Sequence, residues 1–320
     1  MDVKKLLKKH NLPETIIGTC PIQDLQKNKL SFFERPKFAK YVKPNKGSIV
    51  LVKTDLKKYV EKIPGNKYIF ISNPINVFLE IHNMFFQNER SFKDSDMKST
   101  IGKNSDIHPS VFIGGNVKIG NNVFIGAHVC IGNNVSIGDN SRIFPNSTIY
   151  DKVKIGNNCR FESGVVIGAQ GYQRLYDKNG RPHQMIHIGG VKIGDRVELG
   201  ANTTVDRGTF MDTIIEDDVK TDNHNHIAHN DVIKKNTRLA ASIVIGGSTI
   251  VGENVWIGVG AVLSDNIVIG DNAEIRMGAV VASSVASNSK VAGFYAIDNN
   301  SWMMFMKNTY KDYVLNKGKK

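Results

Sequence analysis

An apolar residue occupies every sixth position from residue 101 to residue 167, and this spacing constrains the fold more than any other feature. Eleven of these twelve positions hold isoleucine and the other holds Phe161. In a chain that is 41% hydrophobic, chance fills one chosen set of twelve positions with a probability of roughly 2 × 10⁻⁵. The segment is therefore a structural repeat.

A period of six residues excludes an α-helix, whose apolar positions recur every 3.6 residues. Each unit fits a short strand instead, because a second apolar residue, such as Val117 before Ile119, lies two positions earlier and shares the strand face. The Gly-Asn-Asn that follows tolerates the positive φ of a tight corner. Three units complete one triangular coil, so stacked coils predict a mainly β solenoid of parallel strands.

The repeat also divides the chain. We expect a small α/β domain over residues 1–98, a β-helix over residues 99–287 and a C-terminal helical extension over residues 288–320. The phase breaks at residues 168–187, which predicts a loop that leaves the coil. Loops on a rigid scaffold commonly carry function.

The first domain lacks the repeat but contains segments typical of an α/β fold. Residues 48–53 and 67–72 read as buried strands, and residues 3–10 as a short basic helix. Residues 74–87 read as a second helix with a proline in its first turn. These segments predict a small α/β domain.

The C-terminal extension carries an apolar stripe after a possible helix cap at residues 299–301. The stripe comprises Trp302, Met303, Phe305, Met306 and Tyr310. We expect a helix that packs on the end of the coil or on a neighbouring subunit. A site for an acyl chain or a carrier protein is the alternative.

The net charge of +12 has two interpretations. It reflects a lysine-rich surface, or it serves an acidic partner such as a nucleotide, a coenzyme or an acidic carrier protein. Nucleic acid is not an expected partner, because the lysines are scattered and no stacking motif accompanies them.

The lack of a recognisable targeting signal and the pattern of cysteines predict a cytoplasmic protein. No apolar run approaches the length of a membrane span, and the first residues lack the apolar core of a signal peptide. We therefore expect at most peripheral membrane contact. The three cysteines have no metal-ligand spacing, which favours buried thiols in a reducing compartment.

Three of the nine histidines, His224, His226 and His229, fall within ten residues. The His-x-His pair could ligate a metal, but no nearby Cys or Glu completes a ligand set, so we expect no metal. Polar residues on the outer face of a coil explain the first two histidines. His229 is better explained as a general base oriented by Asp222, seven residues before it.

The interior pattern is also interrupted in this region. Asn225 and Asp231 occupy positions that usually hold valine. We interpret this local loss of the apolar pattern as a mark of a functional site.

Gly247 follows His229 by three repeat units and should lie directly beneath it on the next coil. A glycine there lets a substrate approach the backbone, and its N–H can donate to an oxyanion. The chain has no G-x-S-x-G, P-loop or Rossmann fingerprint. This set of groups suits direct attack of a substrate amine or hydroxyl on a thioester.

Several segments resemble one family. Residues 205–213 (VDRGTFMDT), 222–230 (DNHNHIAHN) and 190–201 are similar to the signature of the UDP-3-O-(3-hydroxyacyl)glucosamine N-acyltransferases of lipid A biosynthesis. Residues 30–38 and 71–74 are similar to the uridine-binding domain of that family. The resemblance implies that the β-helix is left-handed.

The resemblance also implies a homotrimer with active sites between adjacent subunits. His229, oriented by Asp222, would deprotonate the 2-amino group of a UDP-linked glucosamine. The amine would then attack the thioester of a 3-hydroxyacyl chain on acyl carrier protein. Gly247 matches the backbone donor and Phe32 the aromatic residue that stacks on uracil. No cofactor is bound permanently, and acyl carrier protein or coenzyme A brings the acyl group as a co-substrate.

The chain departs from the family pattern at three points. Asn266 stands where the family places a second histidine, and Arg35 stands where a uracil-contacting asparagine is expected. The C-terminal extension is also shorter. We expect Asn266, Arg35, Asn223 and Asn230 to contact substrate.

These departures keep two alternatives open. The first is a sugar-nucleotide N-acyltransferase that uses a short acyl-CoA to make sugars for surface polysaccharide. The second is a non-catalytic scaffold, which the combination of Asp222, His229 and Gly247 argues against.

Overall fold

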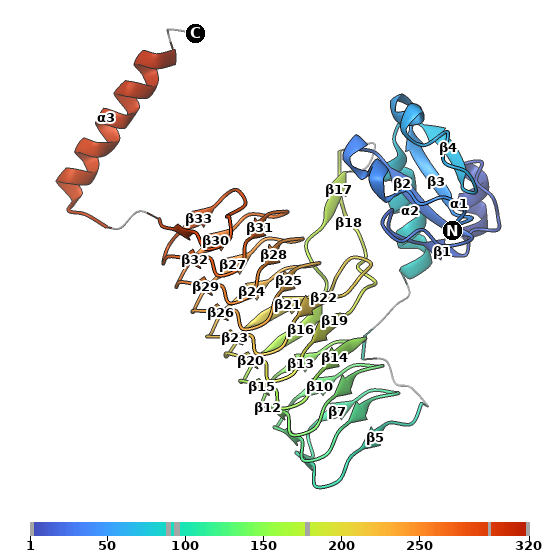
Figure 1. Cartoon of the computed structure of the whole chain (residues 1–320). Helices are drawn as coiled ribbons and strands as arrows, with labels where there is room; N and C mark the ends of the chain where they lie inside the picture. The colour runs from blue at the N-terminus through green and yellow to red at the C-terminus, as the bar shows by residue number, and fades with distance from the viewer. Residues whose placement is uncertain (1–2, 88–90, 93–96, 177–179, 294–295, 318–320) are drawn as a thin grey trace.

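The computed structural model describes residues 3–87, 91–92, 97–176, 180–293 and 296–317. A long solenoid forms the body of the molecule, an α/β domain lies beside its middle, and a helix projects from its C-terminal end (Figure 1). None of the helices in these ranges has the length and apolar character needed to cross a membrane.

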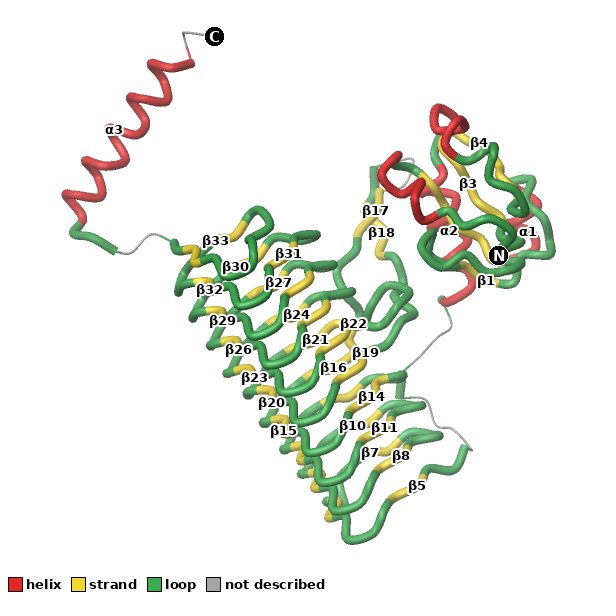
Figure 2. Tube along the Cα trace, in the orientation of Figure 1, coloured by secondary structure: helices red, strands yellow, loops and turns green. Residues whose placement is uncertain are grey.

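The solenoid has three parallel sheets, which we call faces 1, 2 and 3. Ile131 pairs with Ile113 on one side and Ile149 on the other, so neighbouring strands are three repeat units apart. The predicted coil of three short strands and three corners is therefore confirmed, and the strands are short segments between loops (Figure 2).

Face 1 contains nine strands. They are β5 (Thr100–Ile101), β8 (Lys118–Ile119), β11 (Ser136–Ile137), β14 (Val153–Ile155), β19 (Val191–Ile193), β22 (Thr213–Ile215), β25 (Val232–Ile233), β28 (Ile250–Val251) and β31 (Val268–Ile269).

Face 2 contains ten strands. They are β6 (Asp106–Ile107), β9 (Phe124–Ile125), β12 (Arg142–Ile143), β15 (Arg160–Phe161), β20 (Glu198–Leu199), β23 (Lys220–Thr221), β26 (Arg238–Leu239), β29 (Trp256–Ile257), β32 (Glu274–Ile275) and β34 (Lys290–Val291). Because β34 pairs with β32, the coil continues past residue 287, the boundary expected from the sequence.

Face 3 contains nine strands. They are β7 (Phe112–Ile113), β10 (Cys130–Ile131), β13 (Thr148–Ile149), β16 (Val166–Ala169), β21 (Thr204–Asp206), β24 (His226–Ile227), β27 (Val244–Ile245), β30 (Val262–Leu263) and β33 (Val280–Val281).

The interior of the coil is one continuous aliphatic core, because the second residue of nearly every strand points inward. At many corners the chain turns at an asparagine whose backbone adopts the left-handed conformation, as at Asn122 with a φ of 55° and Asn140 with a φ of 58°. The predicted role of the Gly-Asn-Asn corners is thus confirmed.

Polar residues in the interior positions bond neighbouring coils, which corrects one expectation. Asn225 accepts the N–H of Ile243 (2.9 Å), and Asp231 accepts the N–H of Thr249 (2.8 Å). Far from this region, Ser141 accepts the N–H of Cys159 in the same way (3.1 Å). Loss of the apolar pattern at Asn225 and Asp231 therefore reflects backbone capping and does not by itself mark a functional site.

The N-terminal domain is a parallel four-stranded sheet with two α-helices and two 3-10 helices. The elements are α1 (Val3–Lys9), β1 (Gly18–Thr19), β2 (Lys29–Phe33), η1 (Pro36–Tyr41), β3 (Ile49–Lys53), η2 (Thr54–Tyr59), β4 (Lys67–Ile71) and α2 (Pro74–Phe86). Both predicted strands and both predicted helices are present, although β4 is only partly buried. The Asn73 side chain caps α2 by accepting the N–H of Asn76 (3.2 Å).

The loop predicted at residues 168–187 leaves the coil and forms the docking surface for this domain. It contains an antiparallel hairpin of β17 (Arg174–Tyr176) and β18 (Pro182–Gln184). Asn83 of α2 donates to Gln184 O (2.8 Å) and accepts from Ile186 N (3.1 Å). Met185 is buried in the core of the N-terminal domain.

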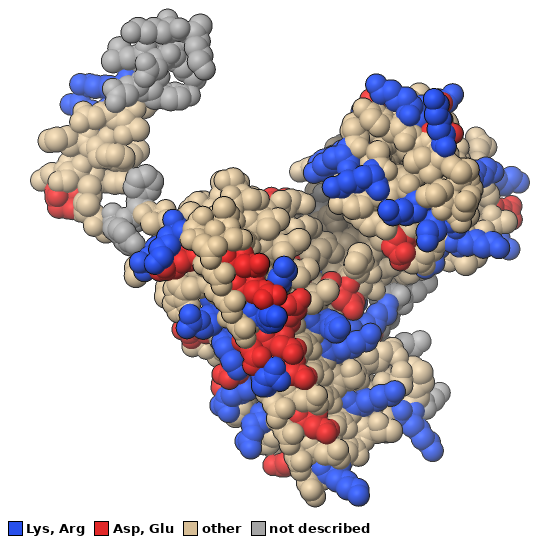
Figure 3. Space-filling view, viewed as in Figure 1, with Lys and Arg blue, Asp and Glu red and all other residues tan. Residues whose placement is uncertain are grey.

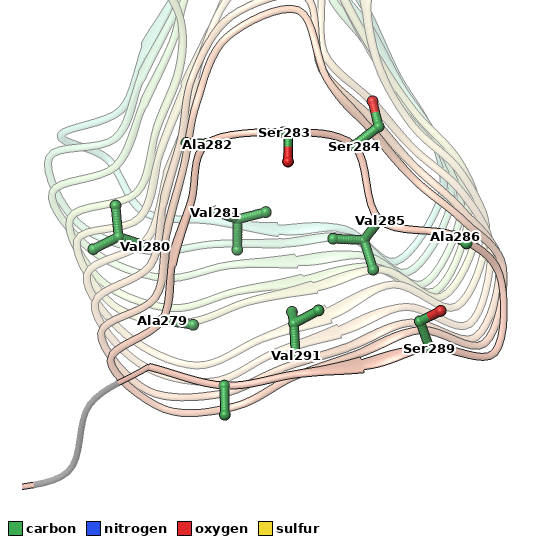
Figure 4. A pocket seen from close by; sticks show the side chains of 11 residues that line it. Ala279, Val280, Val281, Ala282, Ser283, Ser284, Val285, Ala286, Ser289 and Val291 are labelled. Carbon is green, nitrogen blue, oxygen red and sulfur yellow. The ribbon is translucent and has the colours of Figure 1, made fainter. Parts of the chain in front are cut away.

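The C-terminal helix α3 (Asn299–Lys317) stands clear of the solenoid in Figure 1. The apolar residues whose side chains the structure describes are exposed, including Trp302 and Phe305. The last coil ends in an open hollow between Val281, Val285 and Val291 (Figure 4). The described helix does not fill this hollow, so packing of α3 on the end of its own coil, one of the two expected positions, is not found.

The buried carboxyl of Asp231 predicts a pH-dependent stability. Burial raises its pKa to about 9 from a usual value of 3.8, and its Oδ2 has no hydrogen-bond partner among the described residues. The unfolded chain releases this proton near pH 4 while the folded chain keeps it, so stability falls as pH rises from about 4 to about 9.

We therefore expect Asp231→Asn to raise Tm by about 2–4 °C at pH 8 and to leave it unchanged at pH 4. Thermal melts at both pH values measure this difference. Asn225→Asp, which places a carboxyl in the equivalent position of the same coil, should lower Tm at pH 8. An equal effect of Asp231→Asn at the two pH values would contradict the assignment.

Candidate active site

His229 lies at the corner between faces 3 and 1, directly after β24. Ala228 is buried before it, and Asn230 turns the chain in the left-handed region with a φ of 62°. This corner geometry leaves the imidazole half-buried on the outside of the coil, between the loop at residues 168–187 and the loop at residues 206–212.

Gly247 lies beneath His229, as the coil of three repeat units predicts. Ser248 N donates to His229 O (2.9 Å), and a Cβ at Gly247 would lie 2.8 Å from both Cε1 and Nε2 of the imidazole. A side chain at this position would therefore displace the ring. The backbone reaches the histidine only because the residue is a glycine.

The N–H of Gly247 is available as a donor. At equivalent corners a side chain of the next coil accepts this N–H, as Asp151 does for Asn133 (2.8 Å). Beneath Gly247 the carboxylate of Asp265 instead accepts from Asn266 Nδ2 (2.6 Å) and Ser264 Oγ (3.2 Å). In the described part of the chain, the N–H of Gly247 consequently bonds to no acceptor.

The side chain of Asn230 is bonded to the other ring nitrogen of His229. Its Oδ1 accepts the N–H of Thr209 (2.7 Å), so its Nδ2 faces His229 Nδ1 at 2.8 Å. Nδ1 then accepts, and the neutral ring carries its hydrogen on Nε2. Thr209 Oγ1 extends the network by donating to Gln173 Oε1 (3.1 Å).

The surroundings of His229 favour its neutral form. Burial lowers its pKa, His226 lowers it further, and Asp265 acts in the opposite direction. A general base must be unprotonated at the working pH, so this electrostatic environment suits proton abstraction.

The expected pairing of Asp222 with His229 is not formed within one chain. Asp222 lies at the preceding corner, between faces 2 and 3, and its Oδ1 accepts the N–H of Asn223 (2.7 Å). Strand β24 separates the two corners, so a spacing of seven residues spans one side of the coil and does not stack the side chains. No hydrogen bond joins Asp222 to His229 in the described chain.

The remaining predicted residues fall into three places. Asn266 lies one coil below Gly247 and donates its N–H to Gly247 O (3.0 Å). Asn223 stays at the corner of Asp222, where its Oδ1 accepts the N–H of Ala201 (2.7 Å). Phe32 and Arg35 belong to the N-terminal domain.

In that domain, Phe32 is half-buried, with its ring centroid 4.8 Å from that of Phe78 on α2, whereas Arg35 is exposed. Their contact with substrate stays a prediction.

The three clustered histidines do not converge. His224 lies at one corner and His226 on β24, where its Nδ1 is 2.8 Å from Thr204 Oγ1, while His229 occupies the next corner. The described residues contain no group of three or more His, Cys, Asp or Glu side chains that could hold a metal ion.

Two buried residues near the site were not anticipated. His187, at the end of the loop, places its ring centroid 4.9 Å from that of His229. Asp206, in the D-R-G segment, is buried, which raises its pKa to about 7. The interruption of the repeat at residues 168–187 pointed to the loop, but no spacing in the sequence could show which of its residues turns inward.

Family models match the chain along the solenoid. The model of bacterial transferase hexapeptides, described as six repeats, matches residues 98–133, 134–169 and 248–283. The model of the hexapeptide repeat of succinyl-transferase matches residues 186–209. Fold, repeat and corner site together define a hexapeptide-repeat transferase.

Curated relatives narrow this class. UDP-3-O-acylglucosamine N-acyltransferases are 38% identical in Pseudomonas paraeruginosa, over 73% of this chain and 66% of that protein, and 34% identical in Coxiella burnetii, over 72% and 70%. The chain belongs to the UDP-3-O-acylglucosamine N-acyltransferase family. It spans slightly less than two thirds of the Pseudomonas paraeruginosa relative.

Solved structures agree on the fold. A UDP-N-acetylglucosamine acyltransferase from Campylobacter jejuni is similar with a TM-score of 0.50 and 22% identity, over 56% of this chain and 68% of that chain.

If His229 is the base, its loss should abolish most activity without unfolding the chain. We expect His229→Ala to lower kcat by about 10²–10⁴-fold, the usual effect of removing a general base, with Tm nearly unchanged. His226→Ala is the matched control, because this histidine lies on the adjoining strand of the same coil and should leave kcat within a few-fold. Undiminished turnover by His229→Ala would remove the proposed base.

Proposed function

We propose that this protein transfers an acyl group from a thioester to the amine of a nucleotide-linked amino sugar, in a pathway of the lipid A type. The donor we favour is a 3-hydroxyacyl chain on acyl carrier protein. The observation that carries the proposal is the neutral imidazole of His229 above the free backbone N–H of Gly247. The names of the curated relatives support the choice of acceptor.

The reaction follows from these two groups. His229 takes a proton from the neutral sugar amine as the nitrogen attacks the thioester carbonyl. Negative charge develops on the carbonyl oxygen, where the Gly247 N–H can stabilise it. Collapse of the tetrahedral intermediate forms the amide and breaks the C–S bond, and the imidazolium returns its proton to the leaving thiolate.

The tautomer of His229 adds a requirement. Proton abstraction at Nε2 needs the ring hydrogen on Nδ1, where Asn230 now presents its Nδ2 group. An acceptor must therefore replace that group at Nδ1 when the base acts, either because the amide turns or because a carboxylate approaches. Asp222 of an adjacent copy is the carboxylate that the proposal assigns to this role.

Asn230 offers a direct test of the tautomer. Asn230→Asp keeps an oxygen for Thr209 N–H and adds an acceptor for Nδ1–H, so we expect kcat to be retained or raised and the acid limb of the pH profile to move to higher pH. Asn230→Ala leaves Nδ1 without a side-chain partner and should lower kcat by roughly 10-fold or more. The pH dependence of kcat/KM for both variants measures this, and equal losses in the two would refute the tautomer argument.

In this proposal, the N-terminal domain binds the nucleotide part of the acceptor substrate. Lys and Arg side chains spread over its visible surface (Figure 3), which suits a diphosphate. In the proposal, Phe32 stacks on the base and Arg35 contacts the base or a phosphate. The docking of α2 on residues 184–186 holds this domain beside the loop that borders His229.

The proposal includes assembly of three copies into a homotrimer through faces 1 and 3 of the coil. Towards the C-terminal end of the coil, the outward residues of faces 1 and 3 become aliphatic and remain exposed. They are Val244, Ile250, Val262, Val268 and Val280. Face 2 instead carries ion pairs such as Lys220 with Glu198 (2.6 Å). Faces 1 and 3 meet at the corner of His229, so copies that bury them would enclose the site.

The acyl donor and acceptor are tested together. The protein is assayed with long 3-hydroxyacyl carrier protein and with short acyl-CoAs, each with UDP- and dTDP-linked amino sugars. We expect transfer from the long carrier-bound chain to the UDP-linked amine, by a preparation that sediments as three chains. Activity only with short acyl-CoA would select the surface-polysaccharide alternative, and no transfer to any amine would overturn the proposed function.

A further inference from the structure

His187 is fully buried against the candidate base. Its side chain is 0% exposed, and its ring meets that of His229 edge to face at a centroid distance of 4.9 Å. We propose that His187 is a positioning residue that holds the imidazole of His229 in place and uncharged. The proposal rests on the proposed function for the role of His229, although the contact itself does not.

The main chain and ring of His187 are fixed from three directions. Its N–H donates to Gln170 Oε1 (2.8 Å) and its carbonyl accepts from Gln170 Nε2 (3.0 Å). Its Nδ1 accepts the N–H of Gly171 (3.1 Å), so the neutral ring carries its hydrogen on Nε2. One glutamine and one backbone amide thus set both the position and the tautomer.

Gly171 brings the two histidines together. A Cβ at this residue would lie 2.6 Å from His187 Cε1, 2.8 Å from His187 Nδ1 and 2.9 Å from His229 Cβ. The loop backbone at Gly171 therefore lies against both side chains, and only a glycine leaves room for both.

The hydrogen on Nε2 of His187 has no partner that meets hydrogen-bond geometry among the described residues, although the main chain of Arg207 lies close enough to favour the protonated ring. A buried donor without a well-aligned partner is unfavourable for folding. Such a residue is expected to have a purpose beyond stability, and here the packing against His229 supplies one.

The charges around His187 keep it neutral. Burial is the main cause that lowers its pKa to about 4, and His229, His82 and Arg207, the charged or titratable groups that face it, lower it further. None of these three groups is acidic. His187 therefore stays uncharged while His229 gains and returns a proton, and it shields one side of the working imidazole from water.

The N-terminal domain reinforces this position. His82 of α2 lies with its Nε2 2.7 Å from the carbonyl of Ile186, the residue before His187. Helix α2 of the N-terminal domain thus contacts the residue that directly precedes His187.

Two histidine variants and one activity-independent readout test the proposal in the full-length protein. His187→Ala should lower kcat by about 10-fold or more with little change in KM, because the base loses its support but the substrate contacts remain. Water that enters the vacated space should also raise the pH at which His229 becomes neutral. His187→Phe keeps an aromatic wall and should recover most of kcat.

The pH shift is measured by the reaction of His229 with diethylpyrocarbonate, which acylates an imidazole only in its neutral form, followed by mass spectrometry to identify the modified residue. We expect the midpoint to move to higher pH in His187→Ala and to stay at the wild-type value in His187→Phe. His187→Gln, which keeps an acceptor for Gly171 N–H, replaces the alanine variant if that variant fails to fold. An unchanged midpoint and kcat in a folded variant without the ring would overturn the proposal.

The two proposals fail separately. If the wild-type protein transfers no acyl group, the proposed function is lost, while the modification midpoints still decide the role of His187. If transfer occurs and depends on His229, but the ring of His187 can be removed without effect on either readout, only the positioning role is lost.

Discussion

The regular stacking of coils, three repeat units to a coil, is the constraint on which the structure depends. Backbone N–H groups of each coil donate to carbonyls of the next, as Gly132 does to Ile149 (2.7 Å), and inward isoleucines stack above one another inside. The ladder leaves little freedom at a corner, because each corner residue is held between its counterparts on the coils before and after. Space for a substrate at such a corner therefore arises only where a neighbouring segment has no side chain, that is, where it has a glycine.

His229 illustrates this dependence. The absence of a side chain at Gly247 opens the space below its ring, and the absence of one at Gly171 lets the excursion loop approach from the side. Asp265, which would cap the Gly247 N–H by analogy with other corners, is turned towards its own neighbours. The candidate site thus arises where the regular bonding between coils is interrupted.

The loop at residues 168–187 joins two parts of the molecule. Met185, which follows the hairpin, is buried in the core of the N-terminal domain, and His187, two residues later, packs against the ring of His229. A single excursion from the coil therefore positions the domain assigned to the nucleotide and supports the candidate base.

Residue spacing was sufficient to predict the solenoid and the position of Gly247 beneath His229, because a ladder with a constant period converts sequence separation directly into distance. Spacing did not decide the partner of His229, since Asp222, seven residues earlier, lies one side of the coil away at a different corner. The sequence pattern also suggested a function for Asn225 and Asp231, whose side chains bond the backbone of the next coil. A polar residue in the core is equally compatible with capping and with catalysis until its partners are known.

The sequence by itself determined the repeat, the coil length, the corners and the candidate base with its glycine, because each depends on contacts between residues at a fixed separation. Only the tertiary structure decided that Asn230 bonds Nδ1 of His229, that His187 packs on its ring, and that α2 docks on the excursion loop. These contacts join segments between which no period exists. Their geometry depends on how a loop folds back on the coil, and that is set by burial and hydrogen bonding in three dimensions.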